Sequence, residues 1–177
     1  EQLLINYANE KLQRRFNRTV FDEEMALYEA EGVAAAVDLD YADNADVLAL
    51  IGGRRPPGVV ETLDEESKLP RGSAVNFRAR LIKRVGGDGR FDAPRSLSSL
   101  FTIDHYAGRV TYDAAAMVAK NTDSVTVDAL AFFATCSAPV AAACFAGAGG
   151  ASKRSVGGAF KASLASLVSA LESTRAR

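Results

Sequence analysis

The residues best suited to binding phosphate gather in a glycine-rich stretch, AGAGGASKRSVGG, at residues 146–158. A phosphate-binding loop requires G-x-x-x-x-G-K-[ST], in which backbone amides surround the phosphates and the lysine reaches the terminal groups. Here Ser152 precedes Lys153 and Arg154 follows it, and no strand pattern leads into the stretch. The sequence therefore predicts a flexible basic loop rather than a nucleotide site.

Metal-binding patterns also fail. An EF-hand loop that began at Asp38 would need glycine at position 43 and glutamate at position 49, where Asp43 and Ala49 stand. His105 is the only histidine, which excludes multi-histidine sites. Its place beside Tyr106 in a predicted hairpin turn favours a structural role, so we expect no metal ligands.

The carboxylates of Asp64, Glu65 and Glu66 are consecutive, and neighbouring side chains on a helix point in different directions. We therefore expect them to form a solvated helix face instead of an acid–base pair. With no other constellation of reactive side chains, we expect the chain to have no catalytic residues of its own.

Charge is unevenly distributed, although the net charge over 177 residues is only −1 and gives no reason to expect nucleic acid as a partner. Residues 22–66 hold thirteen carboxylates and two arginines, whereas residues 71–95 hold seven cations and two aspartates. This asymmetry fits either a charged surface that meets a partner or two solvated faces.

Cysteine spacing and hydropathy indicate the cellular compartment of the protein. Cys136 and Cys144 lack C-x-x-C spacing and lie in an apolar, alanine-rich stretch, which favours free thiols in a reducing compartment over a disulfide. No apolar run approaches the roughly 20 residues that a membrane span needs. We therefore expect a cytoplasmic protein without a transmembrane segment.

The first secondary-structure element predicted from the sequence is a long helix. Residues 1–31 contain neither glycine nor proline, and Gly32 then supplies a left-handed stop. Because no residue precedes Glu1 to cap this helix, we expect the chain to be part of a longer protein. The predicted apolar face comprises Leu4, Ala8, Leu12, Phe16, Phe21, Met25 and Tyr28.

The next segments predict a loop with a short helix at 32–53 and a helix, a turn and a second element at 54–85. In that second element, Val75, Phe77, Ala79 and Leu81 alternate as in a strand. The spacing of Phe77, Leu81 and Val85 also suits a helix face, but the pattern alone favours a strand.

The remaining segments predict a hairpin at 100–114, helices at 124–145, the loop at 146–158 and a last helix at 159–175. Together these elements predict an α-rich mixed α+β fold with one β-hairpin.

Four stretches, EQLLINYANEKLQRRFN, NFRARL, HYAGRVTY and VGGAFKASLASLVSALEST, resemble successive parts of the myosin motor domain, in the same order and spacing. The resemblance covers nearly the whole chain. It implies the lower, actin-binding half of the motor's central region, part of a P-loop motor domain whose nucleotide core lies outside these residues.

The resemblance implies that residues 1–31 are the relay helix, which carries the state of the nucleotide site toward the lever arm, and that 32–53 hold the relay loop. Such an element needs one place to bend. We expect the bend at Asn17, Thr19 and Val20, which are weak helix formers. The expected coupling residues are Asn6, Asn9, Phe16 and Phe21.

Residues 56–81 resemble the family's actin-binding helix-loop-helix position by position, which implies a helix at 74–84. Lys153 and Arg154 fall in the loop that meets the acidic surface of actin in the family. The short strut that joins the halves of the actin cleft corresponds to Lys120, Asn121, Thr122 and Asp123. The residues implied to contact actin in the helix-loop-helix are Pro56, Val59, Leu63, Leu69, Pro70 and Arg71.

The resemblance thus implies a fragment of a myosin, an actin-based motor driven by ATP. ATP and Mg²⁺ would be bound by the rest of the motor, and this chain alone would have no ATPase activity. The implied partners are the actin filament, the nucleotide core and converter of the same motor, and light chains, in a cytoskeletal myosin complex. The alternatives are a non-motor actin-binding module that has lost ATPase function, or a truncated product without function.

Overall fold

The computed structural model describes residues 1–33, 43–95, 99–121 and 155–173, together with 132, 135 and 137–140. The described residues form a mixed α/β fold with a small antiparallel sheet. Its elements are α1 (Gln2–Glu31), α2 (Ala45–Gly52), α3 (Val59–Lys68), α4 (Ala74–Val85), β1 (Phe91–Asp92), β2 (Leu100–His105), β3 (Gly108–Asp113), α5 (Ala114–Asn121) and α8 (Val156–Ser173).

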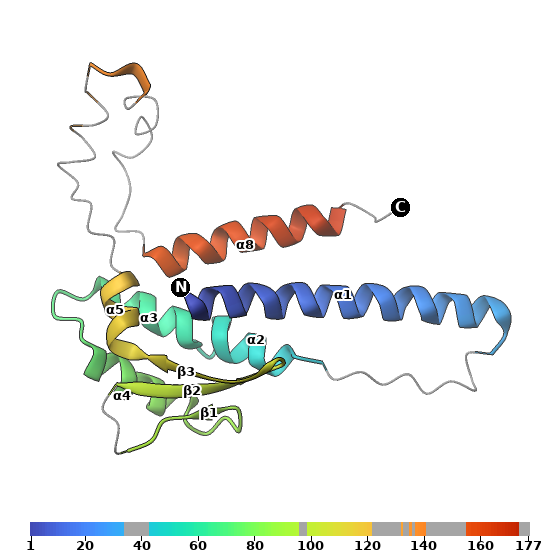
Figure 1. The fold of residues 1–177 in the computed structure, drawn as a ribbon, viewed down its shortest axis with the longest axis horizontal. Helices are drawn as coiled ribbons and strands as arrows, with labels where there is room; N and C mark the ends of the chain where they lie inside the picture. Colours follow the sequence, from blue (N-terminus) through green and yellow to red (C-terminus); the bar gives the residue numbers. More distant parts are fainter. Residues whose placement is uncertain are drawn as a thin grey trace.

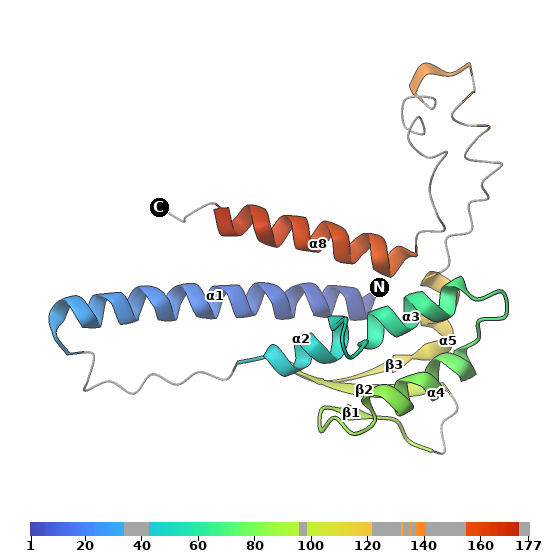
Figure 2. The same cartoon turned by 180° about the vertical axis from the view of Figure 1, so that it is seen from behind.

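The elements form a compact lower part from which the two longest helices extend side by side (Figure 1). The lower part contains α2 to α5 and the sheet, and the connection between α3 and α4 forms one tip of the molecule. Seen from behind, α1 and α8 again run alongside each other, and the far end of α1 projects away from the rest (Figure 2).

The helix α1 is continuous and ends at Gly32, which adopts φ 74° and donates its backbone N–H to the carbonyl of Glu29. No break occurs at residues 17–20, where we expected a bend. The buried side chains of α1 are Leu3, Tyr7 and Glu10. Of the predicted apolar face, Leu4 and Ala8 pack against the core, whereas Leu12 and Phe16 are exposed, Phe16 to 64%. The prediction is therefore corrected beyond the first third of α1.

The segment at 74–85, where the alternating pattern favoured a strand, is the helix α4. Ser73 caps it by accepting a hydrogen bond from the amide of Asn76 at 3.2 Å. Phe77, Leu81 and Val85 are buried at a spacing of four residues, which places them on one helix face.

The sheet has the order β1-β2-β3, with every neighbouring pair antiparallel. Its hairpin pairs Phe101 with Tyr112, and Gly108 at the turn has φ 132°, a conformation that favours glycine. The two-residue strand β1, which the sequence did not predict, adds Phe91 opposite Ile103.

An aromatic cluster joins this sheet to α4. The ring of Phe101 lies 6.2 Å from that of Phe77, 5.8 Å from that of Phe91 and 5.6 Å from that of Tyr112, measured between centroids. All four side chains are buried, so the face of the sheet that they occupy forms the centre of the hydrophobic core.

The last described helix, α8, begins at Val156, three residues before the predicted start. Residues 156–158 are therefore helical and do not belong to the glycine-rich loop. The rest of that predicted loop, 146–154, and most of the predicted helices at 124–145 lie outside the described residues. None of the described helices is both long and apolar enough to cross a membrane.

Candidate functional site

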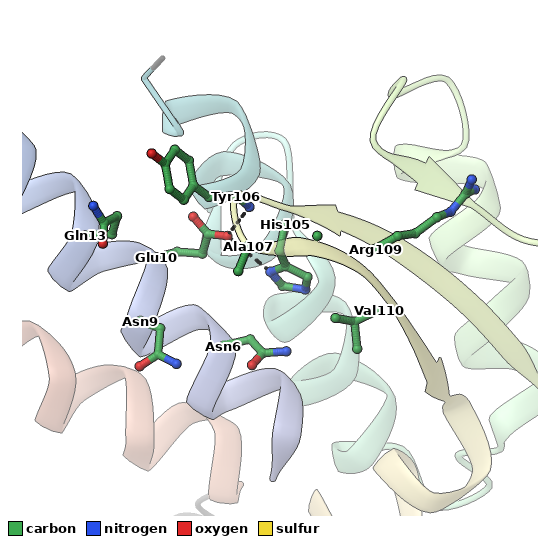
Figure 3. Close-up of a pocket in the computed structure, with 10 residues that line it drawn as sticks. Asn6, Asn9, Glu10, Gln13, His105, Tyr106, Ala107, Arg109 and Val110 are labelled. Carbon is green, nitrogen blue, oxygen red and sulfur yellow. Dashed lines mark hydrogen bonds and ion pairs between the residues drawn. The ribbon is translucent and has the colours of Figure 1, made fainter. Parts of the chain in front are cut away.

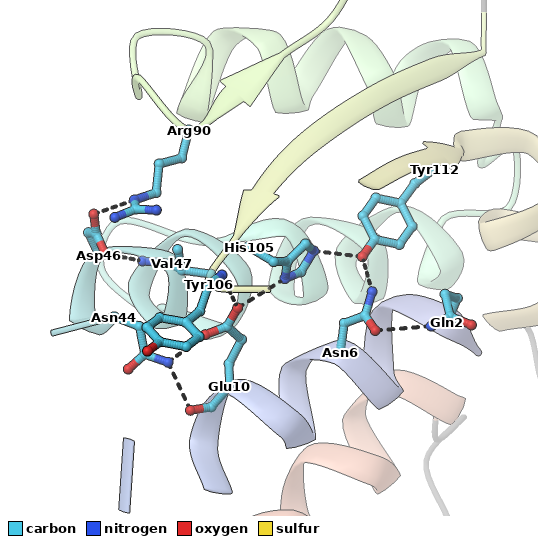
Figure 4. A network of polar contacts seen from close by, with 10 residues as sticks. All are labelled: Gln2, Asn6, Glu10, Asn44, Asp46, Val47, Arg90, His105, Tyr106 and Tyr112. Carbon is cyan, nitrogen blue, oxygen red and sulfur yellow. Dashed lines mark hydrogen bonds and ion pairs between the residues drawn. The ribbon is translucent and has the colours of Figure 1, made fainter. Parts of the chain in front are cut away.

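A buried polar junction connects α1 to the hairpin and to α2 (Figure 4). Its centre is Glu10, which projects from α1 and is 4% exposed. The carboxylate of Glu10 accepts a hydrogen bond from the backbone amide of Tyr106 at 2.7 Å and another from the side chain of Asn44. Asn44 also donates to the backbone carbonyl of Glu10 at 2.9 Å. One acidic side chain thus fastens the hairpin turn and the start of α2 to α1.

The second half of the junction runs through His105, Tyr112 and Asn6. The Asn6 side chain donates to the hydroxyl of Tyr112 at 2.7 Å, and that hydroxyl lies 2.6 Å from Nε2 of His105. The Tyr112 oxygen thus joins Asn6 and His105 in one chain of hydrogen bonds. The other ring nitrogen of His105, Nδ1, lies 3.4 Å from the Glu10 carboxylate.

Burial controls the protonation of this junction. It lowers the pKa of His105 from 6.5, although the nearby Glu10 and Asp104 carboxylates act in the opposite direction. Burial also raises the pKa of Tyr112 to about 12. Both rings are therefore neutral near pH 7, and the junction positions α1 against the hairpin. A structural role for His105 was predicted from the sequence, whereas Glu10 and Tyr112 were not identified.

A cavity of about 230 Å³ lies next to this junction, between α1 and the hairpin turn (Figure 3). Asn9 and Gln13 contribute from α1, and residues 105–110 contribute from the hairpin. Of the four expected coupling residues, Asn6 and Asn9 reach this region. Phe16 and Phe21 lie further along α1, so the structure does not gather the four into one site.

The residues expected to contact actin separate into exposed and buried groups. Leu69 is 43% exposed, and Pro70 and Arg71 beside it are also exposed, at the tip between α3 and α4. The expectation that Val59 and Leu63 present apolar surface is corrected, because both side chains are buried in the core. A spacing of four residues puts them on the inward face of α3.

The remaining two groups of expected actin contacts lie elsewhere. Pro56 is exposed but precedes α3, whereas Leu69 follows it. A helix of ten residues separates them, which corresponds to about 15 Å at roughly 1.5 Å per residue. Lys153 and Arg154 lie outside the described residues.

The tip is supported by Glu66, a residue for which we expected a solvated position. Its side chain is fully buried and accepts a hydrogen bond from the amide of Ser73 at 3.0 Å. Arg80 on α4 lies 3.2 Å from its other carboxylate oxygen. Asp64 is buried too, so the expectation of a solvated acidic face holds only for Glu65. Glu66 therefore links the start of α4 to the end of α3, on either side of the tip.

At the expected strut, Lys120 is exposed and Asn121 is buried, while Thr122 and Asp123 lie outside the described residues. The amide of Asn121 donates to Asp64 at 3.2 Å and accepts from the backbone N–H of Gly157 at 2.7 Å. Asn121 thus ties the end of α5 to both α3 and α8.

The acidic and basic stretches partly pair with each other. Besides the contact of Arg80 with Glu66, Arg84 lies 2.7 Å from Glu65. The 2.5 Å contact between Arg90 and Asp46 spans the two stretches as well. Intramolecular ion pairs between the two stretches therefore neutralise some of the charge asymmetry seen in the sequence. Among the residues that the structure describes, no three His, Cys, Asp or Glu side chains are grouped to hold a metal ion.

Comparison with known proteins identifies the class. The myosin head (motor domain) family matches the chain over residues 1–177. Myosin-15 of Arabidopsis thaliana is 36% identical over 180 residues, which cover 98% of this chain and 12% of that protein. The Myosin-J heavy chain of Dictyostelium discoideum is 40% identical over 125 residues, which cover 71% of this chain and 6% of that protein. The chain therefore belongs to the myosin head (motor domain) family, and it spans a small part of the length of these relatives.

Proposed function

We propose that the chain is the filament-binding part of an actin-based motor driven by ATP, and that α1 transmits the state of the nucleotide site to a lever arm. ATP and Mg²⁺ would bind to other parts of the motor, and light chains would bind to its lever arm. Membership of the motor-domain family supports this proposal. The observation that carries the choice of filament surface is the exposed tip at Leu69, Pro70 and Arg71.

The tip has the composition of a docking surface. Leu69 loses water when it is covered, which contributes to affinity, and the neighbouring Lys68 and Arg71 favour an acidic partner. The buried Glu66 fixes the backbone on both sides, so little conformational freedom is lost on docking. Pro56 would form a separate contact at the start of α3.

A transmitting role for α1 is supported by the contrast between its anchored first turns and the exposed apolar residues further along the helix. Glu10 and Asn6 hold its first turns to the hairpin, whereas further along Leu12, Phe16 and Val20 expose apolar surface at intervals of four residues. An apolar stripe of this kind is suited to packing against another part of the same motor.

The proposed tip is tested by co-sedimentation of the motor that contains this chain with actin filaments, with and without ATP. We expect Leu69→Asp to weaken nucleotide-free binding at least tenfold, because it places a charge in a dehydrated contact. Ile82→Asp is the matched control, since Ile82 is 41% exposed and lies about two turns along α4 from the tip.

Equal affinities for the parent and the Leu69→Asp motor would show that the tip is not the filament surface. Binding that ATP does not change would instead support a non-motor actin-binding module.

A further inference from the structure

Lys161 on α8 joins the ends of two other helices. Its ammonium group donates a hydrogen bond to the carbonyl of Gly52 at 3.1 Å and another to the carboxylate of Glu61. Gly52 is the last residue of α2, and Glu61 lies in the first turn of α3. The Lys161 side chain is only 14% exposed, so this contact is more protected from solvent than a surface ion pair.

The placement of the two charges matches the dipoles of α2 and α3. The last carbonyls of α2 have no partners within that helix and carry partial negative charge, which favours a cation there. The first amides of α3 carry partial positive charge, which favours the Glu61 carboxylate. Lys161 is therefore placed at the negative end of one helix and next to an acid at the positive end of the other.

The turn at 53–58 lies between these two helix ends. The amide of Gly58 donates to the carbonyl of Gly53 at 2.9 Å, and the amide of Gly53 donates to Ala49 at 2.8 Å. A Cβ atom added to Gly58 would lie 2.5 Å from the carbonyl oxygen of Leu50, so the turn packs directly on α2. The residues that it exposes are Arg54, Arg55 and Pro56.

The helix α1 reaches the same point through Tyr7. A Cβ atom added to Gly52 would lie 2.2 Å from the Tyr7 hydroxyl oxygen, so the ring packs closely against the end of α2. Burial, together with the nearby Glu61 carboxylate, raises the pKa of Tyr7, which keeps the phenol neutral. Tyr7 from α1 and Lys161 from α8 therefore meet at the last residue of α2, and Lys161 connects it to Glu61 of α3.

We propose that Lys161 is a positioning residue: it bridges the end of α2 and the start of α3, and so fixes the 53–58 turn, with Arg54, Arg55 and Pro56, to α8. The use of this turn as a contact rests on the proposed function, in which Pro56 belongs to the filament surface. The bridge itself depends only on the geometry of α2, α3 and α8.

Hydrogen exchange of the whole motor, followed in peptides by mass spectrometry, tests the bridge without actin. Lys161→Met keeps an unbranched, largely apolar side chain but removes the ammonium group. We expect exchange in residues 49–58 to accelerate at least tenfold, while exchange in the hairpin at 100–113 stays unchanged. Unaltered exchange at 49–58 would overturn the proposal. Equal acceleration in both segments would also overturn it, because Lys161 would then support only global stability.

Two further variants separate a helix-end bridge from an ordinary ion pair. Lys161→Arg keeps the cation at the carbonyl of Gly52, so we expect it to retain most of the protection at 49–58. The double variant Lys161→Glu with Glu61→Lys restores opposite charges but places each at the unfavourable helix end. We expect this variant to exchange as fast as Lys161→Met, and recovery of protection would overturn the proposal.

A measurement of actin-activated ATPase activity distinguishes this proposal from the proposed function. We expect Lys161→Met to raise the actin concentration needed for half-maximal ATPase activity severalfold while the maximal rate is kept. A motor that does not bind actin at all would refute the proposed function, and the exchange result would still decide the bridge.

Discussion

The junction beneath α1 and the tip between α3 and α4 distribute polar and apolar groups in opposite ways. At the junction, the polar side chains of Glu10, His105 and Tyr112 are buried and bonded to one another or to the backbone. At the tip, Leu69 is exposed while the acid that supports it, Glu66, is fully buried.

Each arrangement has an energetic cost. Buried carboxylates are unfavourable unless they are paired or hydrogen-bonded, and an exposed leucine contributes little to folding. The contacts at the junction fix α1 against the hairpin and α2, whereas the exposed leucine at the tip is what the proposed filament surface requires.

The largest effect is expected at the junction. Replacing Glu10 with alanine removes the carboxylate that accepts from the amide of Tyr106 and from the side chain of Asn44, which then keeps only the backbone carbonyl of residue 10 as its acceptor. We expect local stability to fall by about 3–5 kcal/mol, because each of the two lost hydrogen bonds to a charged acceptor contributes roughly 1.5–3 kcal/mol. Native-state hydrogen exchange of the hairpin in the intact motor measures this loss. Glu23→Ala on the exposed part of α1 is the control. A change of less than 1 kcal/mol would show that the junction does not hold the hairpin.

Two leucines, one within α3 and one at the tip, sharpen the comparison. Leu63 is buried and Leu69 is 43% exposed. We expect Leu63→Ala to lower stability by about 2–5 kcal/mol because it creates a cavity, and Leu69→Ala to change it by less than about 0.5 kcal/mol. Exchange of core amides measures both. Similar losses for the two variants would mean that Leu69 belongs to the core.

The smallest of these effects is the response of the junction to acid. The folded-state pKa of His105 lies below 6.5, so the unfolded chain binds the proton first as the pH falls. The stabilisation is complete above pH 6.5 and is lost as the pH falls toward the folded-state pKa. We expect hairpin opening to become easier by up to about 1.4 kcal/mol per pH unit in that range, and His105→Gln to remove this dependence. An opening energy that rises on acidification would contradict the neutral state of the ring.

Several elements could be predicted because their signals are local. The run without glycine and proline marks α1, Gly32 marks its end, and alternation marks the hairpin β2–β3. The helix α4 was ambiguous because Val75, which suggested alternation, is simply exposed on the outer face of a helix. The spacing of Phe77, Leu81 and Val85 was compatible with a helix, and the resemblance to the motor family decided in its favour.

The candidate sites were less predictable because their contacts join distant residues. The burial of Glu10 depends on Tyr106, which is 96 residues away, and nothing local in the sequence reveals that pairing. In the sequence, Glu66 is part of an acidic run that predicts a solvated helix face. Only the turn between α3 and α4 brings Ser73 and Arg80 into contact with it. The resemblance placed Val59 and Leu63 among the actin contacts but did not reveal that both lie on the inward face of α3.

The most direct test compares the junction and the tip by actin affinity with and without ATP in the intact motor. For Leu69→Asp, we expect affinity to fall in both states while the ratio between them is kept. For Glu10→Gln, which removes the charge but keeps the shape, we expect nucleotide-free affinity to be retained and the ratio to shrink at least threefold. Actin affinity is thus assigned to the tip, and the dependence of that affinity on ATP is assigned to the junction. This assignment is contradicted if Glu10→Gln lowers affinity equally in both states, or if Leu69→Asp changes only the ratio.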